Sequence, residues 1–145
     1  MYDENLNAQR YVRILQENII EPLDDMPLAQ RYHMFFQHDG APPHNSHIVR
    51  ELLNHNFGDN WIGTYGPNRW PPRSPDLTPI DFYFWGDLKD KIYKYRANNV
   101  EELREHFENY IQRVSNIHIY NATRSIAKRC QLCINENGRQ FEHLL

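Results

Sequence analysis

The stretch FFQHDGAPPH, residues 35–44, decides how the first half of this chain folds. Its apolar start, followed by a Gly-Ala-Pro-Pro break, predicts a short strand that leaves the core at His38 and Asp39. In open α/β sheets, ligands bind outside the carboxyl ends of the strands. We therefore place Asp39 at the lip of a sheet, where chemistry is expected.

The segments around this strand predict an alternation of helices and strands. Apolar residues at helical spacing indicate helices before and after it, and the second helix is closed by Gly58. The expected elements are a helix over 8–20 followed by the breakers Pro22 and Pro27, a strand over 32–38, a helix over about 48–57 and a strand over 61–66. A strand, helix, strand order of this length predicts a right-handed crossover with two parallel strands.

A proline-rich stretch, WPPRSPDLTPIDFYFW at residues 70–85, begins the second half. Proline fixes its own φ and restricts the residue before it, so residues 70–77 are predicted to form a stiff loop. Thr78 as N-cap and Pro79 at the first helical position then begin a helix that carries Asp81 in its first turn. The spacing predicts Asp81 on the buried face of this helix.

Two more helices are predicted before the C-terminus. Asn99 is expected to cap the first, with Glu102 at its third position, and the second is expected over about 120–134. An Asn137-Gly138 turn signal follows.

Composition is typical of one globular domain. With 145 residues, 40% apolar and 13% aromatic, the chain can fill a core, and we expect a single domain over 1–145. The formal charge of −3 gives no general basic footprint, so nucleic-acid binding requires a local patch. Neither a signal-peptide pattern nor an apolar run of membrane-spanning length occurs, and we expect a soluble intracellular protein.

Two clusters of metal-ligating residue types have alternative explanations. Cys130 and Cys133 form one C-x-x-C, expected to be two reduced thiols on a helix face rather than a metal or redox site. His44 and His47, three residues apart, could form a nitrogen-rich zinc site with His38. We favour His38 as a core residue, or as a support for Asp39.

Asp39 and Asp81 are candidate ligands for a hard divalent ion, because Mg²⁺ prefers carboxylate oxygens and promotes phosphodiester chemistry. Each aspartate also has a purely structural interpretation. Asp39 precedes a glycine as turn aspartates do, and Asp81 occupies a capping position near a positive helix end. Asp76 is expected to fix its loop by hydrogen bonds.

The two quoted blocks, QHDGAPPH and WPPRSPDLTPIDFYFWGDLK, resemble the catalytic domain of mariner-like transposases in the DDE/DDD superfamily. The resemblance runs from about residue 5 to the end. It implies an α/β, ribonuclease-H-like three-layer fold with a helix-rich C-terminal half. It also implies cut-and-paste DNA transposition in the nucleus, with metal-dependent strand cleavage and transfer.

By this resemblance, Asp39 corresponds to the second catalytic acid and Asp81 to the third, both binding Mg²⁺ or Mn²⁺ in the complete domain. Forty-one residues separate them, a longer spacing than is typical of the family, with the excess in a surface insertion at 57–70. Arg73 could meet phosphate or pair with Asp76. Candidate DNA contacts further along the chain are Lys89, Lys91, Lys94 and Arg96, which otherwise form the solvated end of a helix.

The resemblance breaks upstream of Asp39, where no aspartate ends an apolar strand pattern. We therefore expect a truncated fold that lacks the first acid and the first three strands, with one bare edge on the strand at 33–38. Such a fragment should be inactive alone. DNA, a second copy of the chain or a full-length transposase are the expected partners. The alternative is a non-enzymatic, domesticated remnant that binds DNA or protein.

Overall fold

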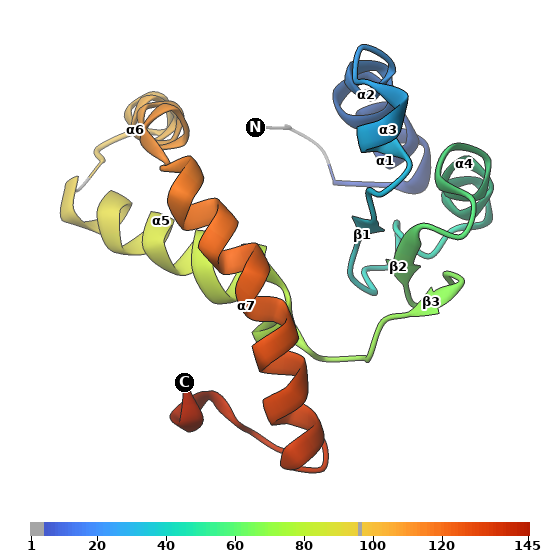
Figure 1. Ribbon diagram of the computed structural model, residues 1–145. Helices are drawn as coiled ribbons and strands as arrows, with labels where there is room; N and C mark the ends of the chain where they lie inside the picture. The colour runs from blue at the N-terminus through green and yellow to red at the C-terminus, as the bar shows by residue number, and fades with distance from the viewer. Residues whose placement is uncertain (1–4, 96) are drawn as a thin grey trace. The chain divides into compact units, whose positions relative to one another are not determined.

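A computed structural model describes residues 5–95 and 97–145, which form two compact units that divide between Arg73 and Ser74. Figure 1 traces both units, and each is described by itself below. The first unit contains α1 (Ala8–Leu15), η1 (Gln16–Ile20), α2 (Glu21–Asp24), α3 (Leu28–Arg31), β1 (Phe36–Gln37), α4 (His47–Phe57), β2 (Trp61–Gly63) and β3 (Asn68–Arg69). The second contains η2 (Pro75–Leu77), η3 (Ile80–Trp85), α5 (Gly86–Ile92), η4 (Tyr93–Tyr95), α6 (Val100–Arg113), α7 (Asn116–Asn135) and η5 (Glu142–Leu144).

The predicted first helix forms but continues beyond residue 20. Asn7 caps α1 by accepting a hydrogen bond from the Arg10 backbone N–H at 2.9 Å. The chain then passes through the π-helical η1 into α2, so Pro22 does not end the helical segment as predicted. A new α-helical turn begins at Glu21, and proline is tolerated in a first turn because its missing N–H is not needed there.

The sheet of the first unit is small and parallel. Its order is β1-β2-β3, with Phe36 opposite Trp61 and Ile62 opposite Asn68. The predicted parallel pairing of the first two strands is confirmed. The first strand is shorter than the predicted 32–38, because the turn after α3 runs to Met34, whose N–H donates to the Arg31 carbonyl at 3.0 Å. Neither β3 nor α3 is predicted from the sequence.

The core of the first unit forms where α1 and α4 meet the sheet. Its fully enclosed members are Leu15, Val49, Leu53 and Trp61. The α4 helix confirms the predicted end at Gly58, whose φ of 55° is a left-handed conformation that glycine adopts without strain.

In the second unit, a π-helical segment replaces the first turns of the predicted helix. Thr78 is extended and its carbonyl accepts from the Phe82 N–H at 3.0 Å, so Pro79 occupies the first helical position as predicted. However, η3 is wider than an α-helix, which shifts the face of every later residue. Consequently Asp81 and Trp85 are exposed, and the prediction of a buried Asp81 is wrong.

The last two long helices follow the sequence signals closely. Asn99 Oδ1 accepts from the Glu102 backbone N–H at 2.8 Å and begins α6, which confirms the predicted cap. The last helix, α7, is longer than predicted and ends where the Gly138 N–H donates to the Cys133 carbonyl at 2.8 Å. Cys130 and Cys133 are free thiols and half-buried. Of the described helices, none is long and apolar enough to cross a membrane.

Candidate functional site

Asp39 lies just beyond the carboxyl end of β1. The strand ladder continues past β1 to His38, whose N–H donates to the Ile62 carbonyl at 3.1 Å, and Asp39 is the next residue. Its side chain is 57% exposed, so the carboxylate faces solvent at the sheet edge where ligands of parallel sheets bind. This is the position that the sequence predicts for it.

Two donors fix the orientation of the Asp39 carboxylate. Oδ1 accepts from the Ala41 backbone N–H at 3.0 Å, an Asx turn of the kind that the structural interpretation predicts. The same oxygen accepts from His44 Nδ1 at 2.6 Å. Because a carboxylate only accepts, the proton lies on this nitrogen of His44. The turn and the histidine together point Asp39 outward.

His44 is in turn held in a stack of rings. The His44 ring lies 4.1 Å from the Tyr11 ring and 5.3 Å from the His38 ring, nearly parallel to the latter at 7°. His38 is 7% exposed, and its Nδ1 lies 3.5 Å from the Tyr11 hydroxyl. A Cβ on Gly63 would come within 2.6 Å of His38 Nε2, so glycine is needed for this close packing.

Burial fixes the protonation of the two groups behind Asp39. Removal from water lowers the pKa of His38 to about 4, with a further lowering by His44 and an opposing effect of Asp39. Burial, and then the negative charge of Asp39, raises the pKa of Tyr11 to about 12. At neutral pH, His38 is therefore an uncharged imidazole and Tyr11 a protonated phenol.

The alternative zinc site finds no support within the part of the chain that the structure describes. His47 points its Nδ1 to Glu51, 3.2 Å away on the same helix. Across residues 5–95 and 97–145, no three histidine, cysteine, aspartate or glutamate side chains are arranged to hold a metal ion by themselves.

Asp81 belongs to the second unit, where it follows the Ser-Pro-Asp loop. The loop forms the short 3₁₀ turn η2, with Leu77 buried beneath it, and the Leu77 N–H donates to the Ser74 carbonyl at 3.2 Å. Asp81 is exposed on the second residue of η3. Short π-helical turns occur frequently at functional sites.

Arg129 on α7 holds this loop from 53 residues away, and sequence reasoning did not find it. Its Nη1 donates to the Asp76 backbone carbonyl at 2.9 Å, and its guanidinium carbon lies 3.7 Å above the Phe82 ring. The side chain is 13% exposed and approaches Glu142 at 3.8 Å. Arg129 thus joins the residues on both sides of Pro79. No local pattern marks it, because its partners are remote in sequence.

We expect Arg129→Lys to loosen this loop. Lysine keeps the charge but loses the planar stacking on Phe82 and the directed hydrogen bond, a loss of about 1–2 kcal/mol in unfolding free energy. Hydrogen exchange at residues 75–82 should become faster. The control is Arg124→Lys, an exposed arginine on the same helix, expected to change stability by less than about 0.5 kcal/mol. Equal effects of the two changes would contradict the role of Arg129.

The other cationic residues predicted to contact DNA differ in their exposure and ion pairing. Arg73 is exposed and has a left-handed φ of 56°. Lys91 is bound to Asp87 at 2.7 Å, whereas Lys89 and Lys94 are exposed. Arg96 lies outside the described residues.

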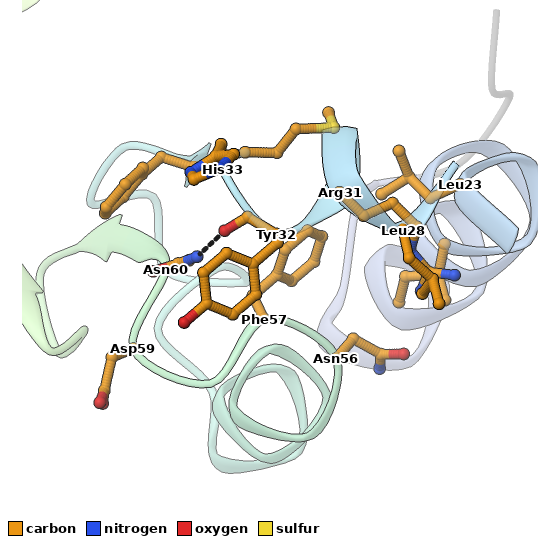
Figure 2. A pocket seen from close by; sticks show the side chains of 12 residues that line it. Leu23, Leu28, Arg31, Tyr32, His33, Asn56, Phe57, Asp59 and Asn60 are labelled. Carbon is orange, nitrogen blue, oxygen red and sulfur yellow. Dashed lines mark hydrogen bonds between the residues drawn. The ribbon is translucent and has the colours of Figure 1, made fainter. Parts of the chain in front are cut away.

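A cavity of about 760 Å³ in the first unit is not centred on Asp39. It lies at the amino ends of β1 and β2, opposite the edge that carries Asp39, and is lined by apolar side chains including Leu23, Leu28 and Phe57. Figure 2 shows Asn60 at this cavity, where its amide donates to the Tyr32 carbonyl at 2.9 Å. Asp39 therefore lies on the surface at the opposite edge of the sheet and not in this cavity.

Comparison with known proteins establishes the class of the fold. The solved catalytic domain of Mos1 transposase, with raltegravir and Mn, matches 97% of this chain with a TM-score of 0.73 and 24% identity. The chain covers 68% of that domain. A pre-cleavage Mos1 transpososome gives a TM-score of 0.81 at 21% identity, with 97% of this chain and 40% of that chain covered. The predicted ribonuclease-H-like α/β fold is confirmed.

Sequence comparison then shows which proteins the chain is related to. The transposase of transposable element Tc1 from Caenorhabditis elegans is 31% identical over 103 residues, 71% of this chain and 35% of the relative. No protein-family model matches. The homologues of this chain are Tc1/mariner transposases, and its structural neighbours are the catalytic domain of one of them. The chain spans about a third of the Tc1 transposase.

Proposed function

We propose that this chain is part of a DNA-cleaving transposase domain, in which Asp39 and Asp81 are ligands for catalytic divalent metal ions. The observation that carries the proposal is the Asp39 carboxylate, exposed just beyond a parallel strand and held outward by Ala41 and His44. Transposon-end DNA is the proposed substrate. The nucleus is the proposed place of action.

The donor set suits Mg²⁺ or Mn²⁺, since both aspartates offer the hard oxygen atoms that these ions prefer. The bound ions would activate the attacking hydroxyl and stabilise the leaving oxygen at phosphorus. Asp39 Oδ1 is occupied by its two donors, so Oδ2 is the atom proposed to meet the metal. His44 would keep the carboxylate oriented, as hydrogen bonds to ligating carboxylates do.

We also propose that the 145-residue chain alone does not cleave DNA, because the described residues include no acid in a position equivalent to the family's first. Within the described residues before β1, the chain forms helices and turns, and no strand there ends in an acid. Asp24 is bound to Arg31 at 3.0 Å. Two carboxylates without a third hold divalent ions weakly.

Purified chain is therefore expected to leave supercoiled plasmid intact in the presence of Mg²⁺ or Mn²⁺, measured by gel mobility. Asp39→Asn should change nothing in that assay. Nicking by the unmodified chain that disappears in Asp39→Asn would overturn the proposed inactivity.

Reading the transcript upstream of the Met1 codon tests the metal role directly. A longer reading frame with an aspartate at the end of an apolar strand should encode a metal-dependent nuclease. In that longer chain, Asp39→Asn and Asp81→Asn should each abolish nicking, whereas Asp59→Asn and Asp90→Asn, both exposed carboxylates, should preserve it. Nicking that survives both of the first two changes would contradict the assignment of Asp39 and Asp81.

A further inference from the structure

In the second unit, α6 and the segment from α5 to η4 enclose a cavity of about 460 Å³ whose lining is rich in cations and aromatic rings. The residues that matter for binding are Lys91, Lys94, Tyr95, His106, Asn109 and Arg113. Neither the sequence patterns nor the relatives' names assign a role to the α6 side of this cavity.

Helical spacing places the polar groups of α6 on one stripe. His106, Asn109 and Arg113 follow one another at three and four residues, so they share the face that lines the cavity. The glutamates of α6 at other positions of the wheel are Glu101, Glu105 and Glu108. Glu102, near His106, accepts from the Asn98 backbone N–H at 2.8 Å. Glu102 thus lies one turn before His106 on the same stripe, where Asn98 binds it, whereas the other three glutamates lie off this stripe.

Lys91 does not contribute net charge to the cavity. Asp87 Oδ2 accepts from Lys91 Nζ at 2.7 Å and from the Tyr110 hydroxyl at 2.8 Å. The hydrogen bond from Lys91, and then that from Tyr110, lowers the pKa of Asp87, so this acid stays ionised and neutralises Lys91.

Lys94 and Arg113 supply the charge that remains. Both side chains are exposed, and among the described residues the structure gives neither of them an acidic partner. Two unneutralised cations on a concave surface attract an anion more strongly than the same charges on a flat one, because low-dielectric walls focus the field. The cavity is thus suited to phosphate groups.

An aromatic ring beside these cations indicates what kind of anion the cavity can bind. The Tyr95 ring stacks on His106 with centroids 4.8 Å apart and planes 19° apart. Tyr95 is nevertheless 61% exposed, so its second face is open to solvent. Cations that follow a phosphate backbone, combined with an open aromatic face for a base, are the features by which proteins bind single strands.

We propose that this cavity binds single-stranded nucleic acid, with backbone phosphates on Lys94 and Arg113 and a base stacked on Tyr95. An acidic peptide could use the cations but would leave the ring unused. The cavity lies at the far end of the η3–α5 segment from Asp81, so binding is separate from the metal chemistry. This inference rests on the proposed function only for the class of ligand, which is nucleic acid.

The test is binding of a labelled single-stranded oligonucleotide to the full chain, measured by fluorescence anisotropy at several salt concentrations in EDTA. Lys94→Ala combined with Arg113→Ala should weaken binding about tenfold at low salt and lower the salt slope by roughly 1.4, the loss of about two phosphate contacts. The matched control combines Arg104→Ala with Lys128→Ala, two exposed cations of the same unit outside the cavity. Equal losses in both pairs would overturn the proposal.

A second comparison tests the stacked base. Tyr95→Ala should weaken binding of the normal oligonucleotide about fivefold, whereas Tyr95→Phe, which keeps the ring, should bind it normally. On an abasic strand, which has no base to stack, Tyr95→Ala should bind as tightly as the unmodified chain. Equal losses on normal and abasic strands would overturn the stacking. Displacement by polyglutamate as effective as by unlabelled oligonucleotide would instead identify an acidic peptide site. Because metal and nicking play no part, failure of the metal proposal leaves these results interpretable.

Discussion

Trp61→Ala is expected to remove about 3–5 kcal/mol from the stability of the first unit, the range found for large aromatic truncations in cores. The side chain is 1% exposed and packs with Leu53 and Val49. Its Nε1 donates to Asn54 Oδ1 at 2.9 Å, which alanine leaves without a partner. Small domains have only about 5–15 kcal/mol in total, so the variant should be largely unfolded or close to it.

Hydrogen exchange measured during urea unfolding distinguishes the stability of the first unit from that of the second. Protection should fall in α4 and persist in α7, since the substitution acts on the core of the first unit only. Trp85→Ala is the matched control, because Trp85 is 41% exposed on η3, and its loss should stay near 1 kcal/mol or below. Comparable losses for Trp61 and Trp85 would contradict the packing described here.

Acidification is expected to destabilise the first unit through His38. The folded pKa of about 4 lies below the ordinary 6.5, because burial disfavours the imidazolium. The unfolded chain therefore binds a proton that the folded chain excludes, so stability is complete above about pH 6.5 and falls as the pH drops toward 4. The shift corresponds to about 3 kcal/mol by pH 4. Asp39 favours the charged form and His44 opposes it, whereas Tyr11 stays neutral.

The measurement is urea unfolding at pH 7.5 and at pH 4.5 in EDTA, compared with His38→Asn. The variant begins from a lower stability but should lose the part of the pH dependence that His38 causes. Nuclear magnetic resonance of the His38 ring gives a second readout that does not depend on the variant's folding. A titration midpoint near 6.5 would contradict the buried, neutral imidazole.

Local signals in the sequence predicted the elements whose ends are encoded nearby. Gly58 and Asn99 mark helix boundaries within one turn, and both boundaries are confirmed. Asp39 could likewise be placed, since a strand followed by a glycine and proline break locates its lip. The sequence did not separate the turn at Tyr32–Met34 from a strand, because a short run of aromatic and other apolar residues does not exclude a turn.

The remaining differences depend on contacts between distant residues. The π-helical form of η3 turned Asp81 outward, and hydrophobic spacing assumes the α-helical period throughout. Arg129 reaches Asp76 from another helix, so no motif could indicate it. The cavity face of α6 could be drawn on a helical wheel, but only the packed structure shows what lies opposite.

The Asx turn and the His44 hydrogen bond give Asp39 a property that concerns entropy rather than position. Its carboxylate is oriented by residues a few positions along its own loop, before any ligand arrives. A cation that reaches Asp39 need not immobilise a freely rotating side chain, which ordinarily costs about 0.5–1.5 kcal/mol on binding. Asp39 is in this sense preorganised: folding of the first unit alone completes it, and binding there should leave the rest of the loop undisturbed.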